Sequence, residues 1–369
     1  MSLMIHGRTS ANPAMVREYG DDLHLFASRP SRVAVAVLIG LAVLAPFGLS
    51  TFQASVLDYA GIAAIGALGL NLLTGFTGQV SLGHAFFVGS GAYMAGYFGG
   101  QQHWPFLVCL VVAALAGALV GAVIGPFALR LRGNYLAIIT LGLVFLGQHI
   151  FENWTSVTGG LNGTPVAVPA QVGPVNFADL TVFGHTFTRD QGYLYVIWAL
   201  VALVALTSKN LTRSRAGRAM QAVRDRDAAA EAIGIHLAHT KVLAFVVSGS
   251  LAALAGALLG SYQQYVAPDA FSLFLSLQYI AMIVVGGVGT TFGPILGALF
   301  ITAVPRVIEE FSDKIPGVAA AGGKGITVFS LNQAIFGLLI IAFLVLEPRG
   351  IAALWLRMKN YFRSWPFSY

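Results

Sequence analysis

Long apolar runs, separated by short clusters of Gly, Pro and polar residues, fill most of this 369-residue chain. Residues 59–129 include no Asp, Glu, Lys or Arg. A helix needs about 20 apolar residues to cross a bilayer, so a run of this length must cross more than once. The pattern predicts ten membrane-spanning helices, at residues 33–51, 55–74, 81–99, 105–129, 134–151, 192–207, 241–262, 274–289, 291–308 and 331–346.

These runs are apolar on all sides, which favours helices over a membrane β-barrel, whose strands alternate in polarity. A composition of 57% hydrophobic and 10% charged residues, with a mean hydropathy of +0.77, excludes a soluble globule. We therefore expect an all-α polytopic membrane protein. Its expected parts are a segment at 1–32, a transmembrane domain at 33–348 and a tail at 349–369, with long connections at 153–191 and 208–240.

Basic residues are concentrated on one side of the predicted membrane. Of the 21 Lys and Arg residues, all but Arg189, Arg306, Lys314 and Lys324 fall in connections that ten spans place on the same side. The positive-inside rule therefore predicts that both termini and residues 208–240 are cytoplasmic, with 153–191 outside. The net charge of +6 indicates contact with anionic membrane lipid, and we do not interpret it as nucleic-acid binding. The single cysteine, Cys109, excludes a disulfide or a thiolate metal site within one chain.

The longest polar stretch on the predicted cytoplasmic side is residues 209–241. Apolar or small residues recur there at three- and four-residue steps, at Ala216, Ala219, Met220, Val223, Ala230 and Ile233, and Gly234 then supplies a stop. The pattern predicts one short amphipathic helix along the membrane surface. Such a helix would fit a groove of a cytoplasmic protein. The alternative is a solvated basic loop that only sets the topology.

Glycine spacing indicates close helix packing. Gly117, Gly121 and Gly125 repeat at four-residue intervals, as do Gly256 with Gly260 and Gly293 with Gly297. We expect these glycines to pack helices of this chain together, the alternative being a face between subunits. Two glycine-rich breaks, at 75–83 and 286–293, also interrupt apolar stretches. They are compatible with equivalent positions in two inverted repeats of about five spans each.

Polar residues gather around the first break, at Asn71, Thr74, Thr77, Gln79, Ser81 and His84. Backbone freed at a broken helix can meet the ammonium or carboxylate of a substrate, so we predict that these residues line the translocation pathway. The alternative is that they only satisfy one another and the broken backbone, with His84 as a structural histidine. Asp58 and Glu152 are expected at span ends, where water reaches them.

Several blocks follow one another along residues 57–354. They are GLNLLTGFTGQVSLGHAFFVGSGAY (69–93), LRLRGNYLAIITLG (129–142), NWTSVTGGLNG (153–163), GRAMQAVRDRDAAAEAIGI (217–235), VVGGVGTTFGPILGA (284–298) and EPRGI (347–351). Together they resemble the permease subunits of ATP-binding-cassette (ABC) importers for branched-chain amino acids, in particular the LivM type. The resemblance implies a type II-like permease fold with about ten transmembrane helices.

The resemblance also implies that residues 208–240 form the loop that docks on an ATPase. Carried over position by position, the coupling residues are Gly217, Arg224, Asp225, Ala229, Ala230, Glu231 and Gly234. In this assignment alanine permits close approach to the ATPase groove, and Glu231 accepts hydrogen bonds from it. Arg226 stands where a neutral or amide residue is frequent among relatives, so the resemblance does not specify which ATPase docks here.

The implied partners are a second, LivH-like permease subunit, two cytoplasmic ATPase subunits and an extracytoplasmic substrate-binding protein that docks on residues 153–191. ATP and Mg would be bound by the ATPase subunits, and no catalytic residue or cofactor is expected in this chain. Its nearest match to a P-loop includes Gly323 and Lys324, but Val318 replaces the first glycine and Gly325 replaces the hydroxyl residue.

The expected function is import of branched-chain or other hydrophobic amino acids across a bacterial inner membrane. Urea or short amides, and aromatic carboxylates, are alternative cargoes within the family. An ion-coupled secondary transporter is an alternative of another class, but such proteins place ionisable residues within their spans. Residues 59–129 offer only His84 and His103 for that purpose. A membrane receptor or scaffold that binds a partner through residues 209–241 is a third alternative.

Overall fold

The computed structural model describes residues 40, 42–129, 134–182, 185–311, 318–319, 326–347 and 350–364. The chain divides into a larger unit, Pro46–Ala353, and a smaller one formed by Met1–Ala45 with Leu354–Tyr369. The expected segment 1–32 and residues 33–39 and 41 of the first predicted span lie outside the described residues, and residues 42–48 of that span are helical. In the smaller unit, residues 354–364 continue helix α15 (Gly350–Ser364), which starts in the larger one.

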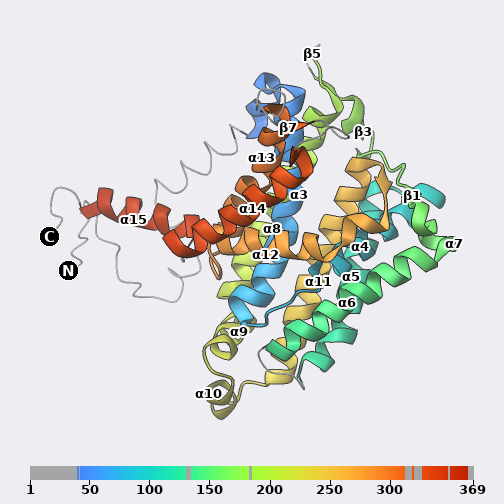
Figure 1. Ribbon diagram of the computed structural model, residues 1–369. Coiled ribbons are helices and arrows are strands. Elements are labelled where there is room, and N and C mark those ends of the chain that lie inside the picture. Colours follow the sequence, from blue (N-terminus) through green and yellow to red (C-terminus); the bar gives the residue numbers. More distant parts are fainter. Residues whose placement is uncertain are drawn as a thin grey trace, which may run out of the picture. The chain divides into compact units, whose positions relative to one another are not determined.

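Helices lie at every predicted span from 55–74 onward (Figure 1). They are α3 (Thr51–Leu70) with the π-helix η1 (Asn71–Phe76), α4 (His84–Ala95) with the π-helix η2 (Gly96–Gln101), α5 (Phe106–Leu129), α6 (Asn134–Asn153), α8 (Arg189–Arg213), α11 (Leu237–Gln263), α12 (Leu273–Gly286), α13 (Gly293–Phe311) and α14 (Val328–Leu346). Within the described residues, five segments are long and apolar enough to cross a membrane: Thr51–Phe76, Phe106–Phe127, Tyr135–Asn153, Arg189–Arg213 and Leu237–Gln263. Shorter apolar helices lie at Leu273–Gly286, Gly293–Val307 and Gln333–Phe343. The prediction of an all-α polytopic membrane protein is confirmed.

Local sequence explains where two of the long helices begin. Ser50 precedes α3, and its Oγ accepts a hydrogen bond from the Gln53 N–H at 3.3 Å while Gln53 Oε1 accepts from the Ser50 N–H at 3.1 Å. Thr188 and Gln191 form the same capping box before α8. Gln191 Nε2 also donates to the Leu49 carbonyl at 2.8 Å, so the starts of α3 and α8 are tied together.

Helix α11 packs against α3, α4 and α5, and small residues bring the backbones together. Gly117 of α5 lies against the backbone of Gly249, and Gly121 follows one turn further along the same contact. Gly256 of α11 packs in the same way on Val88 of α4. A Cβ at any of these glycines would collide with the facing backbone. The predicted intramolecular role of the glycine spacing is confirmed for these positions.

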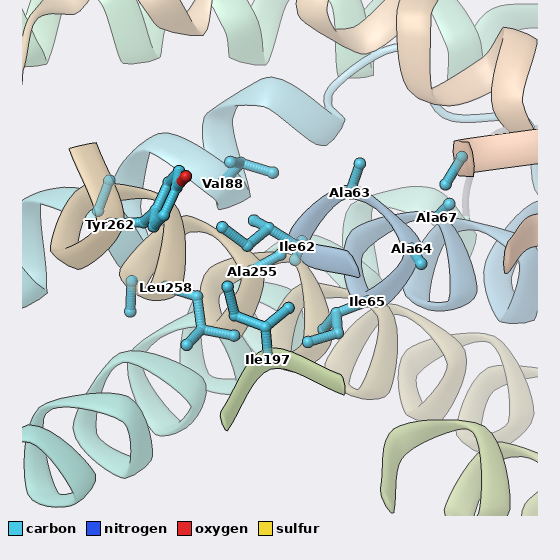
Figure 2. Packing of buried hydrophobic residues seen from close by; sticks show 14 of the residues in the cluster. Ile62, Ala63, Ala64, Ile65, Ala67, Val88, Ile197, Ala255, Leu258 and Tyr262 are labelled. Carbon is cyan, nitrogen blue, oxygen red and sulfur yellow. The ribbon is translucent and has the colours of Figure 1, made fainter. Parts of the chain in front are cut away.

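Branched apolar side chains fill the remaining contacts. Figure 2 shows Ile62 of α3, Ile197 of α8 and Leu258 of α11 pointing toward one another. Each is at most 2% exposed. Because lipid is as apolar as these side chains, the helices gain mainly van der Waals contact from this packing. The packing therefore fixes which helix faces meet.

Burial differs sharply among the spans. In its most apolar window, 83% of the α3–η1 segment is buried, against 28% for α5 and 28% for α6. The exposed positions of α5 and α6 are large and apolar, among them Leu119, Phe127 and Phe145. Helix α3 is thus an interior helix, whereas α5 and α6 present faces suited to lipid or to another transmembrane subunit.

The 27-residue helix α11 separates two ends of the larger unit. It follows the short helices α9 (Arg215–Asp225) and α10 (Asp227–Ala232), and it leads into β6 (Tyr265–Val266), which pairs antiparallel with β1 (Thr164–Pro165). At 1.5 Å per residue, α11 spans about 40 Å. We call the end with α9 and α10 the coupling end, and the end with β1 and β6 the loop end (Figure 1).

Short elements make up the connections. Residues 153–191 include α7 (Thr155–Thr158), η3 (Gly160–Asn162), β2 (Gln171–Val172), β3 (Val175–Asn176), η4 (Phe177–Asp179), β4 (Thr181–Val182) and β5 (His185–Thr186). Strands β2 and β3, and β4 and β5, form small antiparallel pairs. The 3₁₀ turn η5 (Pro268–Phe271) precedes α12, and β7 (Val318–Ala319) pairs in parallel with β8 (Ile326–Thr327) before α14.

Candidate functional site

The coupling segment, residues 209–241, forms two short helices, so the prediction of one helix is wrong. Ser214 caps α9, its Oγ accepting from the Gly217 N–H at 3.3 Å. Arg226 then adopts an extended conformation, with φ −160° and ψ 114°, and separates α9 from α10. The break falls in the charged run 224–227, which offers no apolar side chain to bury. Gly234 follows the end of α10, where the sequence predicted a helix stop, at a φ of +87° that glycine adopts readily.

One face of α9 is fixed to the helix bundle. Gly217, Met220 and Val223 are buried, and Met220 joins a cluster with Leu73 of η1 and Phe245 of α11. The predicted apolar face of this helix therefore packs inward. Arg218 and Arg224 are exposed on other faces.

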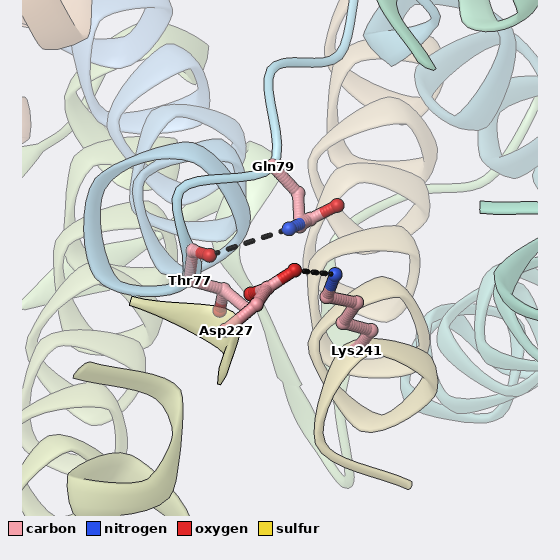
Figure 3. Close-up of polar contacts among 4 residues, drawn as sticks. All are labelled: Thr77, Gln79, Asp227 and Lys241. Atoms are coloured by element: carbon pink, nitrogen blue, oxygen red, sulfur yellow. Dashed lines mark hydrogen bonds and ion pairs between the residues drawn. The ribbon is translucent and has the colours of Figure 1, made fainter. Parts of the chain in front are cut away.

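The second helix, α10, is tied to α11 by an ion pair. Lys241 Nζ lies 2.7 Å from Asp227 Oδ2 (Figure 3), and the Lys241 side chain is only 6% exposed. A lysine this deeply buried needs its counter-charge. The pair thus holds the start of α10 against the start of α11.

The predicted coupling residues of α10 face in different directions. Ala230 is 1% exposed and packs inward, whereas Ala229 and Glu231 are exposed and Ile233 is 76% exposed. Because the helix breaks at Arg226, Ala230 and Ile233 do not share the single apolar face that the sequence predicted. A partner approaching α10 would meet Ala229, Glu231 and Ile233.

The two glycine-rich breaks lie against each other at the coupling end. Asn71 of η1 joins them: its Nδ2 donates to the Thr290 carbonyl at 2.8 Å, and its Oδ1 accepts from the Gly289 N–H at 2.8 Å. A Cβ on Gly289 would lie 3.1 Å from the Gly75 carbonyl oxygen. We call this contact the glycine joint. Inverted repeats would place equivalent span ends at opposite ends of the bundle, so the interpretation of these breaks as equivalent positions is wrong.

Side chains of the coupling segment touch both halves of the glycine joint. A Cβ added to Gly78 would lie 3.4 Å from the Cα of Arg224. A Cβ added to Gly289 would lie 3.3 Å from the Cζ of the same arginine. Lys209 Nζ lies 5.6 Å from the ring centroid of Phe292, a cation–π distance. Movement of α9 would therefore act directly on the ends of α3, α12 and α13.

The predicted pathway residues cluster around the first break, and most of them bond to backbone. Thr77 Oγ1 donates to the Leu72 carbonyl at 3.0 Å, and Ser81 Oγ accepts from the Gly83 N–H at 3.3 Å. His84 Nε2 lies 3.0 Å from the Gly66 carbonyl oxygen. Gln79, which is half-buried, has a longer contact of 3.5 Å from Nε2 to the Thr77 carbonyl (Figure 3). These bonds account for Thr77, Ser81 and His84 structurally, and the pathway assignment stays a prediction.

One residue differs clearly from its expected environment. Asp58 of α3 is 0% exposed, so the expectation that water reaches it is wrong. Helices α8 and α11 cover it, and Arg189, Asp190 and Tyr262 lie within electrostatic range. The available signal was its place four residues inside an apolar run, although only the fold reveals the covering helices. Glu152, in contrast, is partly exposed.

Comparison with known proteins identifies the family. Residues 53–344 match the family described as the permease component of the branched-chain amino acid transport system. The high-affinity branched-chain amino acid transport system permease protein LivM of Escherichia coli (strain K12) is 29% identical over 346 residues, which cover 89% of this chain and 77% of that protein. LivM of Salmonella typhimurium (strain LT2) is 31% identical over 296 residues, covering 76% and 69% respectively.

A relative with a different printed cargo also matches. The autoinducer 2 import system permease protein LsrC of Enterobacter sp. (strain 638) is 30% identical over 250 residues, which cover 66% of this chain and 63% of that protein. No solved structure matches the chain. The family match covers most of the chain and extends from α3 to α14, through the coupling segment and both halves of the glycine joint. The protein is therefore an integral membrane permease that belongs to the family of branched-chain amino acid transport permease components.

Proposed function

We propose that this chain is one transmembrane subunit of an ABC importer in a bacterial inner membrane. Its cargo is branched-chain or other hydrophobic amino acids, moved toward the cytoplasm. The family and the names of the LivM relatives support this cargo. The complete importer adds a second, LivH-like permease, two cytoplasmic ATPases that bind ATP and Mg, and an extracytoplasmic substrate-binding protein.

The observation that carries the proposal is the contact between the coupling segment and the glycine joint. An ATPase that docks on exposed Ala229 and Glu231 of α10 moves α9 with it, because Arg226 alone separates the two helices. Helix α9 then displaces Arg224 at the joint, where Gly78, Gly287 and Gly289 have positive φ. Glycine loops absorb such backbone changes at low cost, so the helices on either side can tilt.

Orientation follows from the same assignment. The coupling end and both chain termini face the cytoplasm, and the loop end, with residues 153–191, faces the substrate-binding protein. The concentration of basic residues on the coupling side supports this arrangement. The apolar faces of α5 and α6 then contact lipid or the second permease.

Proteoliposomes test the function. The complete importer, reconstituted with internal ATP and an added substrate-binding protein, is expected to accumulate radiolabelled L-leucine. Removing either ATP or the binding protein should abolish uptake, and a protonophore should leave it intact. Uptake that needs neither ATP nor the binding protein and that a protonophore abolishes would identify a secondary transporter. ATP-dependent uptake of urea or benzoate in place of leucine would identify one of the alternative cargoes.

We propose further that Gln79 and Ser81 line the inner part of the translocation pathway. Gln79 has the weakest side-chain hydrogen bond among the predicted pathway residues, which leaves its amide available to a substrate. Gln79→Ala and Ser81→Ala should change the leucine concentration for half-maximal uptake more than they change ATP hydrolysis. If both variants keep the wild-type value, the pathway lies elsewhere.

A further inference from the structure

A cluster of charged and aromatic residues lies at the loop end of the bundle. Helix α3 contributes Asp58 and Tyr59, helix α8 contributes Arg189 and Asp190, and helix α11 contributes Tyr262. The rings of Tyr59 and Tyr262 meet edge to face, with centroids 5.1 Å apart. We call these five residues the head-group cluster. Its distance from the coupling segment, at the other end of α11, separates it from the glycine joint and from the predicted pathway residues.

The carboxylate of Asp58 has no hydrogen-bond partner among the described residues. Both of its oxygens are buried and unpartnered. The nearby hydroxyl of Tyr262 donates to Asp190 Oδ1 at 2.9 Å, so its single proton is already used. An isolated buried carboxylate is costly, because its lost hydration is not replaced. Asp58 therefore has an unfilled capacity to accept hydrogen bonds from a cationic group.

Arg189 has the complementary unused group, a hydrogen-bond donor without an acceptor. Its Nη2 donates to the carbonyls of Ser261 and Tyr262 at the end of α11, which holds the guanidinium in place. The guanidinium also lies 5.6 Å from the ring centroid of Tyr262. Its Nε is buried without an acceptor among the described residues. One N–H of a fixed cation is thus left for an anionic group, and it does not reach Asp58.

The two unfilled groups match the two ends of a zwitterion. A primary ammonium donates three hydrogen bonds, and hydrogen-bond donors are what the two Asp58 oxygens lack. A carboxylate accepts from guanidinium N–H groups in short, charge-assisted bonds. Guanidinium groups already lie over the two tyrosine rings, that of Arg306 at 3.8 Å from the Tyr59 centroid and that of Arg189 at 5.6 Å from the Tyr262 centroid. The ammonium is therefore left to Asp58. Urea and short amides carry neither charge, and aromatic carboxylates would leave Asp58 unfilled.

We infer that the head-group cluster recognises the α-ammonium and α-carboxylate of an amino acid, through Asp58 and Arg189 respectively. The inference rests on the proposed function and selects amino acids among its cargoes. Asp58 is fully buried, whereas Tyr59, Arg189 and Asp190 are only partly buried. The cargo therefore reaches Asp58 when these three side chains separate. At the loop end, the cluster is placed to receive cargo released by the substrate-binding protein.

The deciding variant is Asp58→Asn in the complete importer, reconstituted with its substrate-binding protein and assayed with L-leucine. Asparagine keeps the size of the side chain and resembles a protonated, neutral carboxyl group. We expect leucine uptake to fall by about tenfold or more, because a charge-assisted hydrogen bond to the cargo is lost. ATP hydrolysis stimulated by the binding protein should stay within about twofold, since the coupling end is unchanged. Tyr93→Phe is the matched control, because it removes another buried, unpartnered polar atom outside the cluster.

Arg189→Lys provides a second, independent test of the head-group cluster. Lysine keeps the charge near the α11 carbonyls but loses the Nε donor, so leucine uptake should again fall with hydrolysis retained. If both variants transport leucine like the wild type, Asp58 is a neutral structural residue and the inference is overturned. If Asp58→Asn fails to assemble, Arg189→Lys alone decides. Failure of the wild-type importer to take up leucine would instead overturn the proposed amino-acid cargo, before any variant is compared.

Discussion

At the residue scale, a few side chains join parts of the chain that are far apart in sequence. Asn71 bonds to Gly289 and Thr290, more than 200 residues away, with both its donor and its acceptor. Neither contact could be predicted from sequence, because hydrophobic patterning specifies which stretches are helical and not which amide meets which backbone group. The polar residues near the first break were correctly grouped, but their partners were not foreseen.

Gly289 allows the cost of the glycine joint to be measured. Gly289→Ala should lower stability by more than about 1–2 kcal/mol, since an L-residue at a φ of +77° is strained and Arg224 must also move. Thermal unfolding of the purified importer measures this change. Gly173→Ala is the control, with a φ of +60° and open space around it. Equal losses in the two variants would mean that the contact with Arg224 adds nothing.

At the element scale, the coupling segment divides its tasks between two helices. Helix α9 is anchored by Met220, whereas α10 presents Ala229 and Glu231 to solvent. Sequence spacing predicted an amphipathic segment and its end at Gly234. It missed the break at Arg226, because small and apolar residues recur at helical steps on both sides of the break.

Neighbouring alanines of α10 should respond differently to the same change. Ala230→Leu overpacks a buried site and should cost about 1–3 kcal/mol of stability. Ala229→Leu adds bulk on the exposed face, so the unfolding temperature should be unchanged while leucine uptake is lost. Thermal unfolding and uptake, measured on both variants, separate packing from docking. Normal uptake by a stable Ala229→Leu importer would contradict docking on this face.

The ion pair between α10 and α11 offers another test. Asp227→Asn leaves Lys241 buried beside a neutral side chain, at a cost of about 1–3 kcal/mol. Hydrogen exchange of the α10 amides should accelerate, because the helix is released from α11. Asp225→Asn, at an exposed position one residue before the break, should leave exchange unchanged. Slow exchange in both variants would show that other contacts hold α10.

At the scale of the whole molecule, the spans were the most predictable feature, because apolar length alone indicates a membrane helix. Their interior arrangement was not predictable from the same pattern. In their most apolar windows, 83% of the α3–η1 segment is buried but only 28% of α5, yet both are long, largely apolar runs in the sequence. Asp58 shows the consequence, since its burial depends on α8 and α11, which follow it by more than a hundred residues.

Orientation of the whole molecule can be tested by cysteine labelling. Cys109 is 1% exposed and is the only cysteine, so Cys109→Ser supplies a background that should tolerate the change. Leu161→Cys, at a 75% exposed position of the loop end, should react with a membrane-impermeant maleimide in intact spheroplasts. Asn210→Cys, at an exposed position of the coupling end, should react only after permeabilisation. The reverse pattern would invert the proposed orientation.

Because α11 is one continuous helix, its two ends are expected to move together. It carries Lys241 near its first residue and Tyr262 near its last, within one continuous α-helix. A stiff rod transmits axial displacement from one tip to the other without delay, so neither tip can shift alone along the axis. An importer that opened simultaneously to both compartments would leak its cargo down the concentration gradient. In the proposed importer, we therefore expect this one helix to couple opening on one side to closure on the other.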